Sequence, residues 1–205
     1  MIMHSAEVRW FFLGSIPEPT KTWFGTSEEQ EEPTRTDSYV VFPGCSGTSV
    51  KVREGKFEIK ALRSGPKCIE AVRGIFGKIE SWVKWSVELS QSDLTEESGK
   101  EGFDRLDIAK TRWLRKYNVD GSISAEVSRA SRPEQGCNVE LTELMVRSAS
   151  WWTIGFEAFG PAVRVNENLS STVSTFFSKR LPPPCELLEA NSMSYPAWFG
   201  TLGVG

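Results

Sequence analysis

Runs of alternating apolar and polar residues occupy most of this chain. In the run SWVKWSVEL, at residues 81–89, one face carries Val83, Trp85, Val87 and Leu89, and the other carries Lys84, Ser86 and Glu88. A period of two is typical of a half-buried β-strand. Comparable runs stand at 7–14, 37–44, 49–62, 111–119, 122–130, 137–146 and 151–160. Because the connections are short, the pattern predicts eight or nine mostly antiparallel strands.

The run SVKVREGKFEIKAL, at 49–62, is predicted to form a hairpin. Its Glu54-Gly55 pair suits a two-residue turn of type I′. With that turn, the facing pairs on one surface are Arg53 with Lys56, Lys51 with Glu58, and Ser49 with Lys60. The facing residues on the other surface are Val50 and Val52 with Ile59 and Phe57. One face of this hairpin is therefore ionic, with charges of both signs, and the other is apolar.

Helical patterns are few, and turn signals separate the strands. Asp120-Gly121 gives a second strong hairpin signal between two alternating runs. Short helices are expected at 66–74, 100–109 and 168–181. The last of these is the best defined, because Asn168 or Ser170 can cap its start and Pro182 to Pro184 end it. Acidic, solvated loops are expected at 27–34 and 90–102.

An antiparallel sheet of this size must close or stack to bury its apolar face. In a stacked sandwich the apolar faces point inward and the charged faces meet solvent. In a closed barrel wide enough for a charged ligand, the charged faces line the lumen, and the aromatic faces pack outward against helices. Both arrangements have the same alternation, so the pattern leaves both open.

Composition narrows the class of protein. The chain has 205 residues, and no repeat or linker divides it, so we expect a single domain over 1–205. Its net charge is −3, which gives no overall attraction to nucleic acid or to an anionic membrane. A site for a polyanion must therefore be a local concentration of Lys and Arg. The first residues do not resemble a secretory signal, and no apolar run approaches the roughly 20 residues that span a bilayer. We expect a cytoplasmic protein.

Histidine and cysteine usage excludes several kinds of site. His4 is the only histidine and is expected in a frayed terminus, which excludes a histidine-based triad and a multi-histidine zinc site. The four cysteines are widely spaced without a C-x-x-C pair, and we expect reduced, mostly buried thiols. Any chemistry must use carboxylates, Lys, Arg, Ser or an added metal.

A series of short motifs follows in order along nearly the whole chain. The first is Glu7-Val8-Arg9-Trp10-Phe11, and the hairpin then supplies Lys51, Arg53 and Lys60. Further members are Lys84-Trp85-Ser86-Val87-Glu88, Lys110-Thr111-Arg112, Glu140 in NVELTEL, Glu157 in IGFEAFG, and SMSYPAWF at 192–199. In this order they resemble the motifs of the CYTH superfamily, the triphosphate tunnel enzymes that include thiamine triphosphatase and class IV adenylate cyclase. The first motif corresponds to the E-x-E-x-K strand of that family.

The resemblance implies a mainly β (α+β) fold, a closed antiparallel eight-stranded tunnel or barrel with a few flanking helices, one of them near the C-terminus. It implies a triphosphate-containing small molecule as ligand, with Mg²⁺ or Mn²⁺ bridging phosphate and the attacking water. The implied phosphate-binding residues are Arg9, Lys51, Arg53, Lys60, Lys84 and Arg112. The implied metal ligands are Glu7, Glu140 and Glu157, of which Glu140 and Glu157 are also the candidate catalytic residues.

The motifs also depart from the family pattern. Arg9 stands where a second metal-binding glutamate is expected, and Phe11 replaces the lysine. Ser86 and Phe159 occupy positions where a carboxylate is expected. A cation in place of a metal-binding carboxylate weakens divalent metal binding. Three functions therefore stay open: a metal-dependent triphosphatase, a non-catalytic binder of a phosphorylated or polyanionic ligand, and a lipocalin-like barrel for an apolar ligand.

Overall fold

Nine strands of this chain form a single antiparallel sheet. The structure is a computed structural model that describes residues 2–89, 104–181 and 183–203. Its strands are β1 (Ile2–Leu13), β2 (Glu31–Val41), β3 (Thr48–Arg53), β4 (Lys56–Val72), β5 (Ile75–Glu88), β6 (Asp104–Asp120), β7 (Ile123–Val127), β8 (Gly136–Val146) and β9 (Ala149–Gly160). Its helices are α1 (Glu18–Phe24), α3 (Val165–Ser178), the 3-10 turn η2 (Glu189–Asn191) and α4 (Tyr195–Thr201).

The sheet closes on itself as an eight-stranded barrel. The strand order is β2-β3-β4-β5-β1-β9-β8-β6-β7, and an additional pairing of β2 with β6 joins the two sides. Strand β7 pairs with the second half of β6 and lies outside the closed ring. Closure confirms the barrel and excludes the stacked sandwich. It also leaves the outer face of the wall to be covered by helices.

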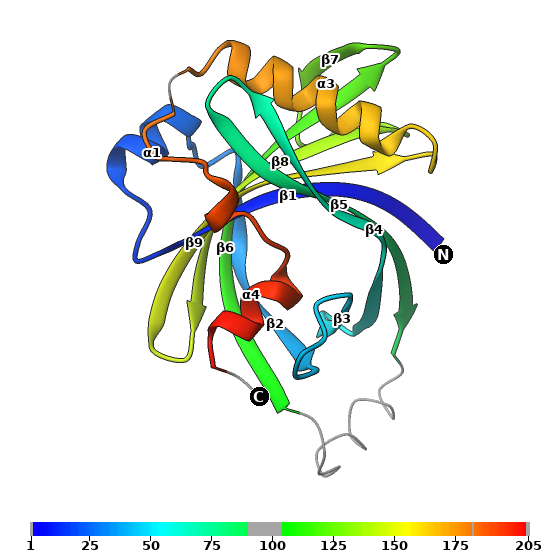
Figure 1. The fold of residues 1–205 in the computed structure, drawn as a ribbon, viewed down its shortest axis with the longest axis vertical. Helices are drawn as coiled ribbons and strands as arrows, with labels where there is room; N and C mark the ends of the chain where they lie inside the picture. The colour runs from blue at the N-terminus through cyan, green and yellow to red at the C-terminus, as the bar shows by residue number, and fades with distance from the viewer. Residues whose placement is uncertain (1, 90–103, 182, 204–205) are drawn as a thin grey trace.

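Helices α1 and α3 cover one side of the barrel (Figure 1). The largest core cluster joins outward-facing strand residues such as Val8, Trp10 and Phe156 to Phe176 and Phe177 of α3. The rings of Phe156 and Phe176 meet edge to face, with centroids 5.4 Å apart. The aromatic residues of the alternating runs thus pack between the barrel wall and the helices, as the barrel interpretation requires.

Both predicted hairpins are present, and the one at 49–62 has the predicted register. In the β3–β4 hairpin, Lys51 pairs with Glu58, Ser49 with Lys60, and Arg53 with Lys56. In the β6–β7 hairpin, Asp120 pairs with Ile123 around the Gly121 turn. Glu54 and Gly55 both have positive φ, at 48° and 72°, as a type I′ turn demands. A short turn therefore sets the strand register from local sequence alone.

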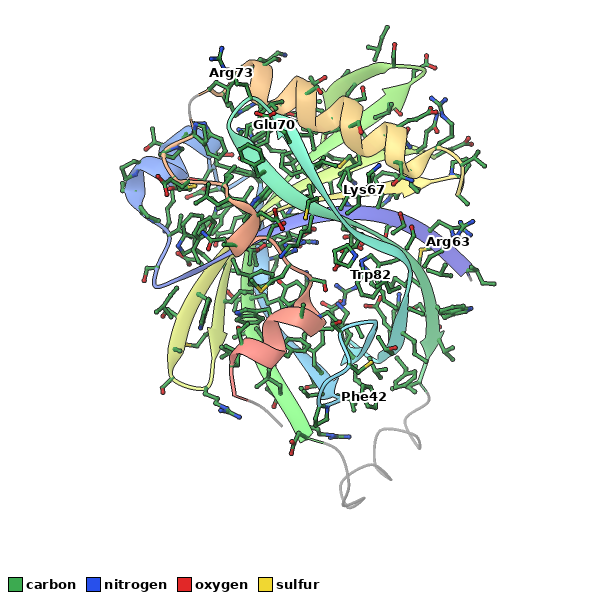
Figure 2. The ribbon with its side chains drawn as sticks, in the orientation of Figure 1. Phe42, Arg63, Lys67, Glu70, Arg73 and Trp82 are labelled. Atoms are coloured by element: carbon green, nitrogen blue, oxygen red, sulfur yellow. The ribbon has the colours of Figure 1, made fainter. Side chains whose placement is uncertain are left out.

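Of the helix predictions that fall on described residues, the one near the C-terminus was right. Segment 66–74 is not helical: it completes β4 and turns into β5, where Cys68 pairs with Lys78. Figure 2 shows Arg63, Lys67, Glu70 and Arg73 along this hairpin, outside the barrel. Cross-strand pairing with β5 overrides the weak local preference for a helix.

Other boundaries also differ from prediction. Residues 104–109 begin β6 and are not helical, and β2 starts at Glu31, inside the expected loop 27–34. The predicted helix at 168–181 begins earlier, at Val165, with Arg164 at its N-cap instead of Asn168 or Ser170. The loop predicted at 90–102, and the start of the helix predicted at 100–109, lie outside the described residues.

The remaining expectations concern the termini and the thiols. His4 does not fray, because it lies within β1 and pairs with Gly160 of β9. All four cysteines are free; Cys137 is buried, but Cys45 and Cys68 are exposed, so the expectation of mostly buried thiols was wrong. Among the helices of the described residues, none has the length and apolar character that crossing a membrane requires.

Candidate functional site

The inward faces of the strands enclose a charged cavity of about 480 Å³. Its cationic lining residues are Arg9, Arg35, Lys51, Arg53, Lys60, Lys84, Lys110, Arg112, Lys116 and Arg132. Its carboxylates are Glu7, Asp37, Glu58, Glu140 and Glu157. Ten cations against five carboxylates leave a formal excess of five positive charges, in a chain whose net charge is −3. The barrel therefore concentrates positive charge in its interior.

One end of this cavity is closed by α4, which lies among β2, β3 and β6 (Figure 1). At that end the inward residues change from charged to apolar, and they pack on Trp198 and Phe199. On β1, for example, the charged Arg9 is followed two residues later by Phe11, which stacks on Trp198 with centroids 4.7 Å apart. Apolar packing thus limits the cavity at this end, and we call the opposite end, where Lys116 and Arg132 belong to the lining, the mouth.

All nine residues predicted for the site line this one cavity. They are Glu7, Arg9, Lys51, Arg53, Lys60, Lys84, Arg112, Glu140 and Glu157. The structure therefore brings together side chains from several strands, as the ordered series of motifs implied. The roles of these residues in phosphate binding, metal binding or catalysis remain predictions.

The three alternate positions of the first motif face inward, but only two of them carry charge. Phe11 does not reach the charged lining but lies in the apolar cluster at the closed end. The inward polar positions of β1 are Ser5, Glu7 and Arg9. The late part of the Lys84 motif also lies elsewhere, because Glu88 is exposed beyond the mouth.

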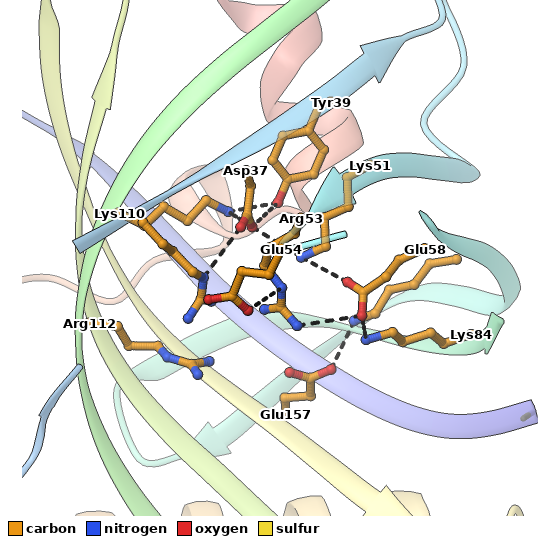
Figure 3. Close-up of polar contacts among 12 residues, drawn as sticks. Asp37, Tyr39, Lys51, Arg53, Glu54, Glu58, Lys84, Lys110, Arg112 and Glu157 are labelled. Carbon is orange, nitrogen blue, oxygen red and sulfur yellow. Dashed lines mark hydrogen bonds and ion pairs between the residues drawn. The ribbon is translucent and has the colours of Figure 1, made fainter. Parts of the chain in front are cut away.

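Asp37 is the centre of the deepest charge network (Figure 3). Its carboxylate lies 3.1 Å from Lys51 Nζ, 3.2 Å from Lys110 Nζ and 3.3 Å from Arg35 Nε. Burial raises the pKa of Asp37, but the lysines and Arg35 outweigh it and hold that pKa well below the usual range. Asp37 is therefore a fixed negative charge that keeps three cations together.

Glu58 organises the cations nearer the mouth. It pairs with Lys51 at 3.2 Å, with Arg53 at 3.5 Å and more closely with Lys84. Burial raises the pKa of Glu58, but these cations lower it to about 2. Since Lys51 pairs with both Glu58 and Asp37, the two networks are continuous.

Lys60 lies between two of the predicted metal ligands. Its Nζ donates a short hydrogen bond to Glu7 and another, at 2.9 Å, to Glu157. Lys60 holds the pKa of Glu157 well below its usual range, whereas burial raises the pKa of Glu7. The two glutamates are direct neighbours in the pairing of β1 with β9, so this contact follows from strand register.

The third predicted metal ligand, Glu140, is held by two arginines. Arg9 Nη2 lies 2.9 Å from Glu140 Oε2, and Arg112 Nη1 bonds its other oxygen. Burial raises the pKa of Glu140, but Arg112 and Arg9 lower it to about 2. Gly155 makes room for this pair, because a Cβ at that position would lie 2.5 Å from Arg9 Cζ. Gly155, the first glycine of the run IGFEAFG, is therefore part of the site.

Two lysines at the deep end carry unusually low pKa values. Lys110 Nζ donates to the Tyr39 hydroxyl at 2.6 Å and lies 3.8 Å from the Tyr195 ring centroid. Burial lowers the pKa of Lys110 to about 7 and that of Lys51 to about 8. The positive charge of the cavity therefore changes near neutral pH.

Sequence reasoning missed several residues of the site. The cavity-lining residues to which it gave no role include Arg35, Asp37, Tyr39, Glu58, Lys110, Lys116, Arg132 and Tyr195. Arg35, Asp37 and Tyr39 alternate on β2, and Lys110 lies two positions before Arg112 on β6. The same period of two that identified the strands could have found them. In the run DSYVVFPG, at 37–44, four consecutive apolar residues follow Ser38, so the alternation that includes Asp37 is hard to recognise.

The described carboxylates do not form a metal centre. In this part of the chain no group of three or more His, Cys, Asp or Glu side chains is placed to hold a metal ion. Glu7 and Glu157 share the ammonium group of Lys60, and Glu140 is occupied by Arg9 and Arg112. A divalent cation would have to displace these cations, so the lining fits an anionic ligand better than a metal.

Comparisons with known proteins do not assign this chain to a family. No protein-family model matches this chain, and no curated protein matches it. A conserved hypothetical protein from Pyrococcus furiosus has a TM-score of 0.47 and 11% identity, over 89% of this chain and 98% of that chain. The S. pombe Pct1 RNA triphosphatase, solved in complex with the Spt5 CTD, has a TM-score of 0.41 and 8% identity, over 87% of this chain and 83% of that chain. At these TM-scores neither structure supports a function, so membership of the CYTH superfamily stays a prediction. The closed eight-stranded barrel is the architecture that the resemblance implied.

Proposed function

We propose that this protein binds a small polyanion that carries a chain of phosphates, such as a triphosphate, in the barrel cavity. The observation that supports this most directly is the excess of ten cations over five carboxylates around one enclosed space. Closely packed cations repel one another, and an anionic ligand relieves that repulsion. Lys and Arg side chains surround Asp37, Glu58 and Glu140, which lie at different depths of the cavity. Hydrogen-bond donors are therefore available along the length of the cavity, which suits an extended anion.

Binding without turnover is the better supported form of this function. The carboxylates that would hold Mg²⁺ or Mn²⁺ are each engaged by Lys60, Arg9 or Arg112. These cations supply the positive charge that a metal would otherwise bring to a phosphate chain. An apolar ligand of the lipocalin kind does not suit a lining with fifteen charged side chains.

Calorimetric titration with tripolyphosphate in the presence of EDTA tests the proposal. Binding is expected without added metal. The double variant Lys116→Gln, Arg132→Gln removes two mouth cations for which no carboxylate ion pair is found among the described residues. The affinity of this variant should fall roughly three- to tenfold, the range expected for losing such contacts.

The matched control is the double variant Lys67→Gln, Arg73→Gln. It makes the same change of charge on the exposed β4–β5 hairpin, outside the barrel (Figure 2). The control should bind tripolyphosphate like the wild type. Absence of binding to the wild type, or equal losses in both double variants, would contradict a site in the cavity.

Metal-dependent hydrolysis of a triphosphate is the second candidate. One observation favours it: Glu80, Glu7 and Glu157 are direct register partners on the adjacent strands β5, β1 and β9. Release of phosphate from tripolyphosphate or ATP with Mg²⁺ or Mn²⁺ tests it. Release that is lost in Glu7→Gln but kept in the exposed control Glu28→Gln would support hydrolysis. No release from the wild type would dismiss it.

A further inference from the structure

One loop of the described structure brings a cation to the mouth of the cavity. Residues 128–135 connect β7 to β8, and Arg132 within them lines the cavity although its side chain is largely exposed. Most cations of the lining, such as Lys51 on β3, lie on strands, where pairing with the neighbouring strands fixes their position. Arg132 has no such support, so its position depends on what holds the loop.

Lys116 holds this loop to the barrel wall. It lies on β6 and lines the same cavity as Lys110 and Arg112 of that strand. Its Nζ donates to the backbone carbonyls of Arg129 and Ser131, both at 2.8 Å. An ammonium group has three N–H donors, so two of the three are used on the loop. Lys116 is therefore committed to the backbone of the loop, even though it belongs to the lining.

A second contact ties the same loop to β2. Arg129 Nη1 donates to the carbonyl of Glu31 at 2.9 Å. Within the loop, the amide of Ser131 donates to the carbonyl of Ser128 at 2.9 Å, which closes a tight turn. Strands β2 and β6 are the two whose pairing closes the barrel. The turn that precedes Arg132 is thus attached to both of these strands.

The charges of Lys116 and Arg132 are close to each other. Burial lowers the pKa of Lys116, and the positive charge of Arg132 lowers it further. The two carbonyl oxygens of the loop offset this repulsion for Lys116. Among the described residues, no carbonyl or carboxylate accepts a hydrogen bond from the Arg132 guanidinium, so its donors can serve an anion at the mouth.

We propose that Lys116 is a positioning residue of the anion site: by holding two backbone carbonyls of the loop it places Arg132 at the mouth, where Arg132 contacts the outer end of the bound phosphate chain. This rests on the proposed function, because the phosphate chain must occupy the cavity. The contribution of Lys116 to affinity is then made through Arg132 and not through a contact of its own with phosphate.

A double-mutant cycle on tripolyphosphate binding tests this inference. The single variants Lys116→Met and Arg132→Gln should each lower the affinity about three- to tenfold, the range for one hydrogen bond. In the Arg132→Gln background, Lys116→Met should change the affinity by less than about twofold, because the group that it positions is already absent. Lys116→Arg keeps the charge and the N–H donors and should retain an affinity within about twofold of the wild type.

A second variant loosens the loop without changing the lining. Arg129→Gln, at an exposed position, removes the contact with Glu31 and leaves Lys116 in place. It should lower the affinity by no more than Lys116→Met does, and the loss should vanish in the Arg132→Gln background. Lys67→Gln, on the exposed β4–β5 hairpin, removes a charge far along the chain from this loop and is the control. It should bind tripolyphosphate like the wild type.

Trypsin reports on the loop without any ligand. It cleaves after arginine, and the bond between Arg129 and Ala130 lies in the exposed turn. Cleavage there should be several-fold faster in Lys116→Met than in the wild type, because a segment that opens more often is cut more often. Arg132→Gln leaves both carbonyl contacts of Lys116 intact and should be cleaved like the wild type.

The outcomes separate this inference from the proposed function. Wild-type affinity in Lys116→Met, or losses that multiply in the double variant, would show that Lys116 does not act through Arg132. Either result would overturn the inference and leave the barrel site standing. Unchanged trypsin cleavage of Lys116→Met would also overturn it, because the loop would then not depend on Lys116. Failure of the wild type to bind tripolyphosphate would overturn both.

Discussion

Individual side chains in this protein are arranged so that carboxylates are shared among cations. Asp37 pairs with three basic side chains, and so does Glu58. Each carboxylate can offset only part of the charge around it, so the cavity keeps a positive excess while its side chains hold a defined geometry. This residue-scale arrangement prepares donors for an anion without requiring them to move.

Lys110 and Lys51 make ligand affinity dependent on pH. Their pKa values of about 7 and about 8 mean that both are charged at pH 6 and largely neutral at pH 9. The groups that face this pair are Asp37, Tyr39, Arg9, Arg35, Arg53, Glu58 and Tyr195. We expect the affinity for tripolyphosphate to fall about tenfold or more as pH rises from 6 to 9, since charged hydrogen bonds are lost. Lys110→Met should bind more weakly at pH 6 and show a flatter profile.

The stability of the ligand-free protein should respond in the opposite direction. The pKa of such a lysine is lower in the folded protein than its value of about 10.4 in the unfolded chain. At pH values between the two, the unfolded chain binds more protons than the folded protein, so the free energy of unfolding rises with pH. The contribution of Lys110 and Lys51 to unfolding free energy therefore rises from about pH 7 to about pH 10. Urea unfolding at several pH values measures this, and a wild-type profile that matches Lys110→Met would contradict the low pKa of Lys110.

At the scale of elements, the same strands contribute side chains to two apolar clusters and to the charged cavity. Their outward faces pack on α1 and α3, and their inward faces are charged near the mouth and apolar under α4. Helix α4 is short, and its stability comes from its aromatic side chains, which are buried among inward strand residues. The depth of the cavity is therefore set by where α4 docks.

Removing the largest side chain of α4 should destabilise the closed end. Trp198 is fully buried and contacts Phe11, Trp151 and Phe199. Trp198→Ala should lower the free energy of unfolding by about 3–5 kcal/mol, because a large cavity replaces the indole. Chemical denaturation measures the change. Thr201→Ser, at an exposed position of the same helix, keeps the hydroxyl that donates to the Trp198 carbonyl and should change it by no more than about 0.5 kcal/mol; equal effects would show that α4 does not hold the closed end.

At the scale of the whole molecule, the barrel separates charge by location. The chain is net negative, yet its cavity is lined by twice as many cations as carboxylates. Negative charge elsewhere on the protein opposes unspecific attraction of polyanions to its surface. Anions are therefore attracted to the cavity and not to the protein as a whole.

A ligand that fills this cavity should stabilise the entire fold, because the barrel is one closed sheet. At a concentration 100 times its dissociation constant, tripolyphosphate should add about 2.7 kcal/mol to the free energy of unfolding. For a chain of this size that corresponds to a rise in Tm of roughly 5–11 °C. Thermal unfolding in tripolyphosphate, with sulfate of equal ionic strength as control, measures it. An equal rise in sulfate would indicate an unspecific salt effect and not a site for a phosphate chain.

The sequence by itself determined most of the strands, the positions of both hairpins, the register of the β3–β4 hairpin and the set of side chains that share its faces. These depend on a period of two and on turns of two residues, which are local properties. For this reason the turn at Glu54-Gly55 is sufficient to place Lys51, Glu58 and Lys60 on one face of the hairpin. The nine predicted cavity residues follow from the same alternation combined with the resemblance.

Only the tertiary structure decided which face is the inside and which charges meet. Alternation is identical in a sandwich and a barrel, and the pairing of β2 with β6 alone closes the ring. Contacts such as Arg9 with Glu140, which are 131 positions apart, depend on that closure. Long-range pairing also decided that 66–74 extends a hairpin, because cross-strand hydrogen bonds outweigh a weak helical preference. Local sequence sets the period and the turns, whereas burial and long-range pairing choose among the folds that share them.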